Sequence, residues 1–286
     1  AHPASRETIR DLQSRGWSSH EMPIDAEGLI LQNQLPDLPW NETRIVDVLL
    51  AHNETGVIQD VSRLSELCIE HNVPLCVDAV QAVGKIPVHF HNLKAMTLSL
   101  GAHKFHGPRG IGALLIRKGL KLAPVLTGGH QEQGKRPGTE PVALIAGMAR
   151  ALELCTDELE TRAKRMTSLR DRLQQGLETR CAPTAVNGSL AQRLPNTLNI
   201  SFPGVEGEAL LIALDLAGIA CSQGSACASG SSEPAAILVA MGKPREMYSS
   251  SIRFSVGTGN IPEEIDAVVL KIADVVERLR SRAKTA

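Results

Sequence analysis

Aromatic side chains are scarce in this 286-residue sequence, at 2% of all residues. They therefore offer few platforms on which nucleic acid bases could stack. A surplus of positive charge is also missing, because 30 Lys and Arg residues are balanced by 31 Asp and Glu residues. A balanced chain is not drawn to nucleic acid or to anionic membranes by its charge. These shortages argue against a nucleic acid partner and favour a small-molecule substrate.

Long apolar runs are absent as well. No run approaches the ~20 residues of a transmembrane helix, and residues 1–4 resemble no part of a signal peptide. We therefore expect a cytoplasmic protein without a membrane partner. The six cysteines form no CxxC pair and have no zinc-type spacing with histidine, which argues against a disulfide framework and a metal site. Thiol chemistry remains open.

The first half of the chain alternates β-type apolar runs with helical patterns. These segments are residues 45–50, 61–71, 73–77, 96–100 and 111–116. The alternation predicts an α/β fold with a mostly parallel sheet flanked by helices. A polar, glycine-bearing loop follows at residues 127–141, and its length is typical of a functional loop.

The second half begins with apolar positions at helical spacing from residue 142 to about residue 177. This spacing predicts one long helix that leads from one domain into another. We expect a large cofactor-binding domain over residues 1–150 and a small α+β domain over residues 151–286. The small domain is predicted to contain a strand at 198–202, a helix at 206–216, a strand at 252–256 and a final helix that begins near Pro262.

Two polar residues directly follow predicted strands. Asp78 ends the run 73–77, at the carboxyl end of a strand, where open α/β folds bind ligands. Taken alone, it is more often a helix N-cap. Lys104 follows the run 96–100. A buried lysine can form a Schiff base, and an aspartate that faces a pyridine nitrogen keeps such a cofactor protonated.

Six motifs extend this pair over nearly the whole chain. In order they are AHNETG (51–56), VDAVQ (77–81), AHKFHGP (102–108), GGHQE with RPGT (128–139), GSAC (224–227) and SSIRFS (250–255). Together they resemble the cysteine desulfurases, pyridoxal 5'-phosphate enzymes of fold type I in the class V aminotransferase group. The resemblance implies a homodimer that takes sulfur from L-cysteine, leaving L-alanine and an enzyme persulfide. It also implies a sulfur acceptor, either an iron–sulfur cluster assembly scaffold or a tRNA-thiolation protein.

The resemblance assigns the cofactor contacts residue by residue. Lys104 would be the Schiff-base lysine, and Asp78 the partner of the pyridine nitrogen. Asn53 and Gln81 would contact the side of the ring that carries its oxygen.

The remaining contacts follow from the same resemblance. His2 would stack on the cofactor ring and move protons, whereas His103 and Thr139 would bind the phosphate. Thr139 would come from the partner subunit. Arg253 would pair with the substrate carboxylate, for which its planar fork is suited.

Cys227 matches the thiol that receives the sulfur. Residues 222–232 are almost all small, which favours a mobile segment that can attack the substrate and then present a persulfide. Cys68 and Cys76 lie in apolar patterns and are expected to be inert structural thiols. Cys221 is ambiguous, with packing the favoured interpretation.

Three features depart from the family pattern. His52 stands where an asparagine is usual, and Gly101 stands where a serine often contacts the phosphate, a loss of about 1 kcal/mol. A phosphate-binding loop is also expected ahead of His2. We therefore expect the sequence to lack an N-terminal segment, and the 286-residue chain alone to hold the cofactor poorly and be nearly inactive.

Two other functions are compatible with the sequence. A selenocysteine lyase would share the cofactor, the fold and the loop cysteine. A truncated, non-catalytic sulfur-relay scaffold would bind partners without turnover. A cofactor absorbance spectrum separates the scaffold from both enzymes, and a comparison of cysteine with selenocysteine separates the enzymes.

Overall fold

The computed structural model describes residues 2–224 and 235–283. The chain divides into two compact units. The terminal unit consists of Ala1–Leu38, Leu49–Asp60 and Glu160–Ala286, and the central unit of Pro39–Val48 and Val61–Leu159. The expected functional domains, 1–150 and 151–286, stay a prediction, because a compact unit does not by itself define where a function resides.

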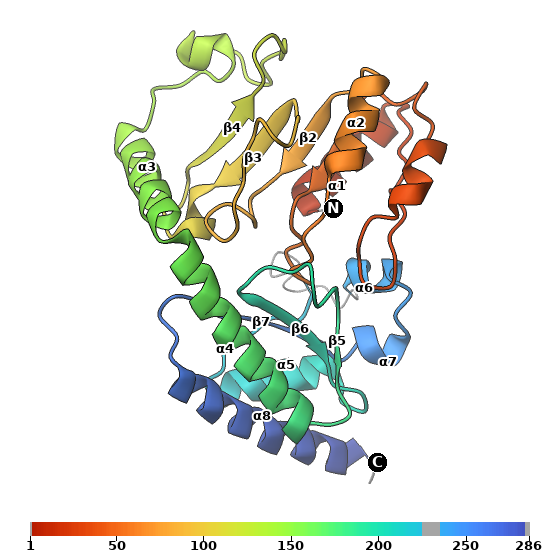
Figure 1. Ribbon diagram of the computed structural model, residues 1–286, viewed down its shortest axis with the longest axis vertical. Coiled ribbons are helices and arrows are strands. Elements are labelled where there is room, and N and C mark those ends of the chain that lie inside the picture. Colours follow the sequence, from red (N-terminus) through yellow and green to blue (C-terminus); the bar gives the residue numbers. More distant parts are fainter. Residues whose placement is uncertain (1, 225–234, 284–286) are drawn as a thin grey trace. The chain divides into compact units, whose positions relative to one another are not determined.

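The central unit is built on a sheet with the strand order β1-β2-β3-β4 (Figure 1). Its strands are β1 (Val46–Leu49), β2 (Leu75–Asp78), β3 (Thr97–Gly101) and β4 (Gly112–Ile116). Strands β2 and β3 are parallel, with Asp78 opposite Ser99, whereas β4 runs antiparallel to β3. All four strands lie where the apolar runs predict them. The parallel pair β2–β3 places two strand ends at one edge of the sheet.

Helices of the central unit come from the segments between and after these strands. They are α2 (Ser62–Glu70), the short 3-10 helices η2 (Ala102–Phe105) and η3 (Gln131–Gly134), and α3 (Val142–Asp157). Leu64, Leu67 and Cys68 are the apolar residues that α2 buries. Their spacing is that of one helix face, which explains why the pattern at residues 61–71 predicts a helix.

The expected single helix from residue 142 to about residue 177 is wrong in one respect. Two helices occupy this stretch, α3 and α4 (Leu159–Arg180), and Glu158 separates them with φ −108° and ψ 9°. Thr156 and Asp157, which precede the break, are weaker helix formers than the leucines and alanines before them. Apolar spacing continues through both helices, so periodicity alone does not reveal the break.

The terminal unit contains an antiparallel sheet with the strand order β5-β6-β7. The strands are β5 (Ala185–Val186), β6 (Thr197–Ser201) and β7 (Ser251–Ser255). Besides α4, the helices are α1 (Pro3–Ser14), η1 (Gln32–Asp37), α5 (Gly207–Leu216), α6 (Ala236–Ala240), α7 (Arg245–Tyr248) and α8 (Pro262–Ala283). The two strands and two helices predicted for residues 198–286 are confirmed within one or two residues of their ends. Among the described residues, no helix is long and apolar enough to cross a membrane.

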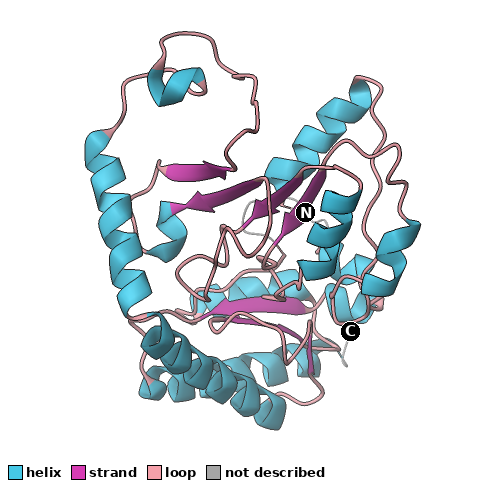
Figure 2. Cartoon of the chain, turned by 45° about the horizontal axis from the view of Figure 1, so that its top comes forward, coloured by secondary structure: helices cyan, strands magenta, loops and turns pink. Residues whose placement is uncertain are grey.

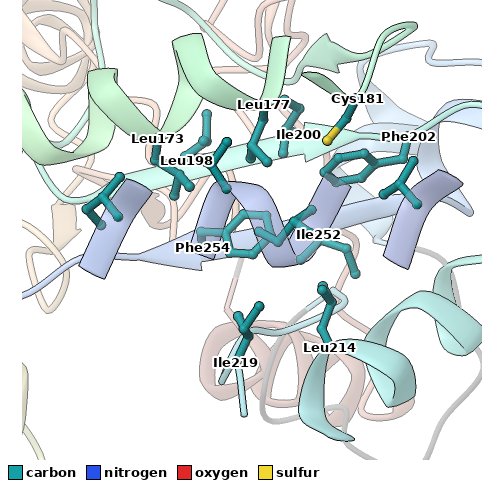
Figure 3. Packing of buried hydrophobic residues seen from close by; sticks show 14 of the residues in the cluster. Leu173, Leu177, Cys181, Leu198, Ile200, Phe202, Leu214, Ile219, Ile252 and Phe254 are labelled. Atoms are coloured by element: carbon teal, nitrogen blue, oxygen red, sulfur yellow. The ribbon is translucent and has the colours of Figure 1, made fainter. Parts of the chain in front are cut away.

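Figure 2 shows helices beside the strands of this sheet. The core of the terminal unit lies against one face of the sheet (Figure 3). Helices α4, α5 and α8 supply apolar side chains to it, and β6 and β7 contribute Leu198, Ile200, Ile252 and Phe254. Side chains alternate between the faces of a strand, so Asn199 and Arg253 point to the other face. This second face is polar and carries part of the candidate site.

Candidate active site

Four of the predicted site residues lie at the end of β2 or in the turns that follow β2 and β3. Asp78 is the last residue of β2, and Gln81 lies in the turn after it. His103 and Lys104 lie in η2, directly after β3. Because β2 and β3 are parallel neighbours, their carboxyl ends share one edge of the sheet, which is where α/β proteins bind ligands.

The Asp78 carboxylate is partly committed to the backbone. Its Oδ1 accepts a hydrogen bond from the Val80 amide at 2.9 Å, as a capping aspartate would. Oδ2 has no hydrogen bond to any described residue, and the side chain is half-buried. Asp78 can therefore cap the turn with Oδ1 and bind a ligand with Oδ2.

Gln81 is held by a residue that the sequence analysis missed. Nζ of Lys85 donates to the Gln81 carbonyl oxygen at 3.0 Å and to Gln81 Oε1 at 2.8 Å. Lys85 is only 9% exposed. A lysine four residues after Gln81 and among apolar neighbours was the available signal, because buried lysines are rare unless they have hydrogen-bond partners.

Close packing joins the turn after β2 to η2. Gly84 has φ +77°, and a Cβ built there would lie 2.5 Å from the Cβ of Phe105. Phe105 is buried beside Lys104, and its carbonyl accepts a hydrogen bond from the Cys155 thiol at 3.3 Å. The turn that carries Gln81 and the turn that carries Lys104 are thus fixed against each other.

The two predicted phosphate ligands are exposed. Partial loss of hydration and the nearby charges of Lys104 and Arg109 lower the pKa of His103, which favours its neutral form. A side chain at position 101 would lie 3.4 Å from the His103 ring, so the serine that Gly101 replaces would contact that ring. Thr139 lies near the end of the segment 127–141, which contains η3.

In the terminal unit, His52 organises the turn that carries Asn53. Its Nδ1 accepts hydrogen bonds from the amides of Glu54 at 3.2 Å and Thr55 at 3.4 Å. Burial, with a smaller contribution from Arg253, lowers the pKa of His52 to about 3. The ring is therefore neutral, and its Nδ1 serves as the acceptor that an asparagine oxygen would supply. This accounts physically for the departure at position 52.

Arg253 connects β7 to that turn. Its Nη1 donates to the Asn53 carbonyl at 3.0 Å, and its Nη2 donates to Ser222 Oγ at 3.1 Å. Two backbone hydrogen bonds also join Arg253 to Ser222, at 2.7 and 3.1 Å. On β6, the neighbouring Asn199 donates to the Glu54 carbonyl at 3.3 Å. The structure thereby brings together Asn53 and Arg253, which lie 200 residues apart in the chain.

Glu54 is a second residue that the sequence analysis did not single out. It is 8% exposed, and its buried Oε2 has no hydrogen-bond partner in the described part of the chain. Burial raises the pKa of Glu54, and the charges of Arg253 and Arg6 oppose this rise. The carboxyl group therefore lies within the electrostatic reach of Arg253.

His2 has a structural role that the sequence analysis did not foresee. It is the N-cap of α1, and its Nδ1 accepts the Ala4 amide at 3.2 Å. A proton that His2 moves would therefore have to sit on its other ring nitrogen, Nε2. A positive charge on His2 would also lower the pKa of His52, so the two histidines are near each other.

The cysteines differ in their accessibility. Cys227 lies outside the described residues. Cys221 packs against the terminal-unit core, and burial raises its pKa to about 11, as it does for Cys68 and Cys181. Burial likewise raises the pKa of Cys76. The packing interpretation is confirmed for Cys68, which is buried, and Cys221 packs against the core although it is only half-buried. Cys76 is also half-buried, and its packing stays a prediction.

Known proteins provide an independent comparison. Residues 1–268 match the family "Aminotransferase class-V". A cysteine desulfurase of Nostoc sp. is 41% identical over 98% of this chain and 70% of its own length. IscS, a cysteine desulfurase of Clostridium botulinum, is 38% identical over 98% of this chain and 71% of its own length. A solved NifS-like protein superposes with a TM-score of 0.90 at 36% identity, covering 98% of this chain and 73% of that protein.

These matches agree with the motifs at the ends of β2 and β3 and in the turn at residues 52–56. The chain belongs to the class V aminotransferase family and, within it, to the cysteine desulfurases that depend on pyridoxal phosphate.

Proposed function

We propose that this chain desulfurates L-cysteine with Lys104 as the residue that carries the cofactor, Cys227 as the sulfur acceptor and Arg253 as the carboxylate ligand. The observation that best supports this assignment is the common sheet edge of Asp78 and Lys104, at the ends of two parallel neighbouring strands.

The side chains of the central unit fit pyridoxal phosphate. Asp78 keeps Oδ2 for a protonated pyridine nitrogen, because Val80 occupies only Oδ1. Lys104 offers a half-buried amine. Gln81 offers its amide NH₂ group to a ring oxygen, because its Oε1 faces Lys85. His103 and Thr139 are the proposed phosphate ligands. When bound, the cofactor supplies an electron sink for the bonds around the substrate Cα.

Each residue then has a definite task. Asp78 keeps the ring nitrogen protonated through a charge-assisted hydrogen bond. The Lys104 amine holds the cofactor and can carry a proton to and from the substrate carbon. His2 is proposed to handle a second proton at Nε2, since Nδ1 caps α1. The thiolate of Cys227 attacks the substrate sulfur, so that an S–S bond forms as the C–S bond breaks. The electron pair of the C–S bond stays with the substrate carbon, which then takes up a proton on the way to alanine.

Arg253 is prepared for an anionic ligand before one arrives. Two of its guanidinium nitrogens are oriented by Asn53 and Ser222, at 3.0 and 3.1 Å. Orienting a flexible side chain in advance lowers the entropy lost on binding. A substrate carboxylate could add to this fork, which favours an amino acid substrate over a neutral thiol.

The partners and location also remain proposals. We propose a homodimer in which Thr139 reaches the partner's cofactor. We further propose, from the family resemblance, transfer of the persulfide sulfur to an iron–sulfur scaffold or a tRNA-thiolation protein. The five described cysteines are free thiols, which suits a reducing cytoplasm.

The first experiment locates the covalent link. The protein is loaded with pyridoxal phosphate, reduced with borohydride and digested, and the modified lysine is identified by mass spectrometry. We expect the label on Lys104, and we expect Lys104→Ala to lose both the visible absorbance and alanine formation. Lys118→Met, at an exposed position, is the matched control. A label on another lysine would contradict the assignment, and a strong preference for selenocysteine would change the substrate.

A further inference from the structure

Lys85 is a buried cation that none of the catalytic tasks above uses. It is 9% exposed, and its Nζ donates to two oxygens of one residue, Gln81. Taking a lysine out of water is unfavourable unless hydrogen bonds replace its hydration. The geometry of Lys85 is thus tied to Gln81, a proposed cofactor ligand.

This contact fixes which end of the Gln81 amide faces which way. An amide has an accepting oxygen and a donating NH₂ group of nearly equal size, so either end can occupy the same space. A protonated lysine has three donors and no acceptor. The Gln81 atom that lies 2.8 Å from Lys85 Nζ is therefore the oxygen, and the NH₂ group is directed elsewhere.

The backbone around Gln81 is held as well. Lys85 Nζ also binds the Gln81 carbonyl, at 3.0 Å. Backbone hydrogen bonds from Ala82 and Val83 to Ala79 tighten the same turn. Gly84 packs against Phe105, the residue after Lys104. Lys85 thus holds Gln81 on a turn whose position relative to Lys104 is set by close packing.

We propose that Lys85 is a positioning residue that directs the Gln81 NH₂ group toward the oxygen of the cofactor ring and strengthens it as a donor. The inference rests on the proposed function, which assigns Gln81 to that oxygen. A cation bound to the amide oxygen polarises the whole amide. Consecutive hydrogen bonds, here from Lys85 to Gln81 and from Gln81 to the ring oxygen, reinforce one another. A stronger donor withdraws negative charge from the ring oxygen. The proton on the neighbouring Lys104 nitrogen is then held less tightly.

The test is a pH titration of the visible absorbance of the cofactor-loaded protein. Lys85→Met should move the midpoint upward by about half a pH unit or more, the shift expected when one hydrogen bond is weakened. Lys85→Arg, which keeps the donors and the charge, should restore most of the wild-type midpoint. Lys118→Met should leave the midpoint unchanged. If Lys85→Met does not fold, Lys85→Gln replaces it, because its amide removes the charge and no longer enforces one orientation of Gln81.

A double-mutant cycle separates this inference from the proposed function. Gln81→Ala should also raise the midpoint, and adding Lys85→Met to Gln81→Ala should then produce no further shift. An unchanged midpoint in Gln81→Ala would refute the assignment of Gln81 itself. A midpoint that moves in Gln81→Ala but not in Lys85→Met would refute only the role of Lys85. An equal shift from Lys85→Met in both backgrounds would also refute it, since Lys85 would then act without Gln81.

Discussion

At the scale of single residues, His52 shows how a different side chain can perform one hydrogen-bonding task. Its neutral ring accepts two backbone amides through Nδ1. The family resemblance identifies position 52 as unusual but does not reveal the compensation. The compensation depends on the burial of the His52 ring, because burial lowers its pKa to about 3 and so keeps the ring neutral.

The lowered pKa of His52 predicts a pH dependence of stability. Between its unfolded pKa of about 6.5 and its folded pKa of about 3, the unfolded chain binds a proton that the folded chain does not. Folding stability is therefore full above pH 6.5 and falls as the pH drops, by up to about 1.4 kcal/mol per pH unit. His52→Asn should remove this part of the acid sensitivity. Urea unfolding at pH 7 and at pH 5 measures the stability that is lost on acidification. Equal losses of stability in the variant and the wild type would contradict the prediction.

Two cysteines near each other in sequence should differ in reactivity. The thiolate is the nucleophile, and at neutral pH a thiol with a pKa of about 11, such as Cys221, is almost fully protonated. We expect Cys227→Ser to form no persulfide and to release no sulfide, although it keeps the cofactor absorbance. Cys221→Ser should form persulfide at close to the wild-type rate. Mass spectrometry after incubation with L-cysteine checks both, and a persulfide on Cys221 would refute the assignment of Cys227.

At the scale of elements, the site depends on how closely one turn packs on another. Gly84→Ala adds a Cβ at 2.5 Å from the Cβ of Phe105, at a φ of +77°. Gly119→Ala shares the positive φ, at +97°, but meets nothing within 4 Å. Backbone strain should lower the free energy of unfolding of both variants by about 1 kcal/mol. Overpacking should lower that of Gly84→Ala by about 1–3 kcal/mol more. Urea unfolding measures the difference.

Cofactor affinity separates the two glycines further. Displacement of η2 in Gly84→Ala should weaken cofactor binding, because Lys104 lies in that element. Gly119→Ala should bind the cofactor as the wild type does. Equal stability and equal affinity of the two variants would show that the turn after β2 does not need close packing on Phe105.

Local patterns are sufficient to predict most elements of this fold. Strands β1 to β4 and helix α2 follow from apolar runs, and the strand ends direct attention to Asp78 and Lys104. The break at Glu158 does not follow, because the apolar spacing continues through it. The role of Lys85 does not follow either, since it depends on a turn that brings its Nζ back to Gln81.

At the scale of the whole molecule, local sequence patterns do not predict which distant segments come together. Residues 49–60 belong to the same unit as residues 160–286, although 99 residues separate the two segments. Hydrogen bonds from Asn199 to Glu54 and from Arg253 to Asn53 help to hold them there. Such pairings come from tertiary structure, so only the family resemblance could name Asn53 and Arg253 together.

The proposed homodimer makes a prediction that involves two chains. If Thr139 serves the partner's site, then Lys104→Ala and Thr139→Ala variants complement each other, because one site of the mixed dimer has both residues intact. Activity at limiting cofactor should be low for each variant alone and should rise when the two are co-expressed. The same rise should not occur when Lys104→Ala is co-expressed with a Lys104→Ala,Thr139→Ala double variant. No rise in the first mixture would place Thr139 in the site of its own chain.

The long separation between Asn53 and Arg253 in the sequence also affects how the protein folds during its synthesis. A ribosome that adds about 5–20 residues per second needs about 10–40 s to make the 200 residues between them. During that interval the turn at residues 52–56 lacks the strands β6 and β7 that anchor it, and closing so long a loop is slow. Residues that leave the exit tunnel early are thus among the last to reach their native neighbours.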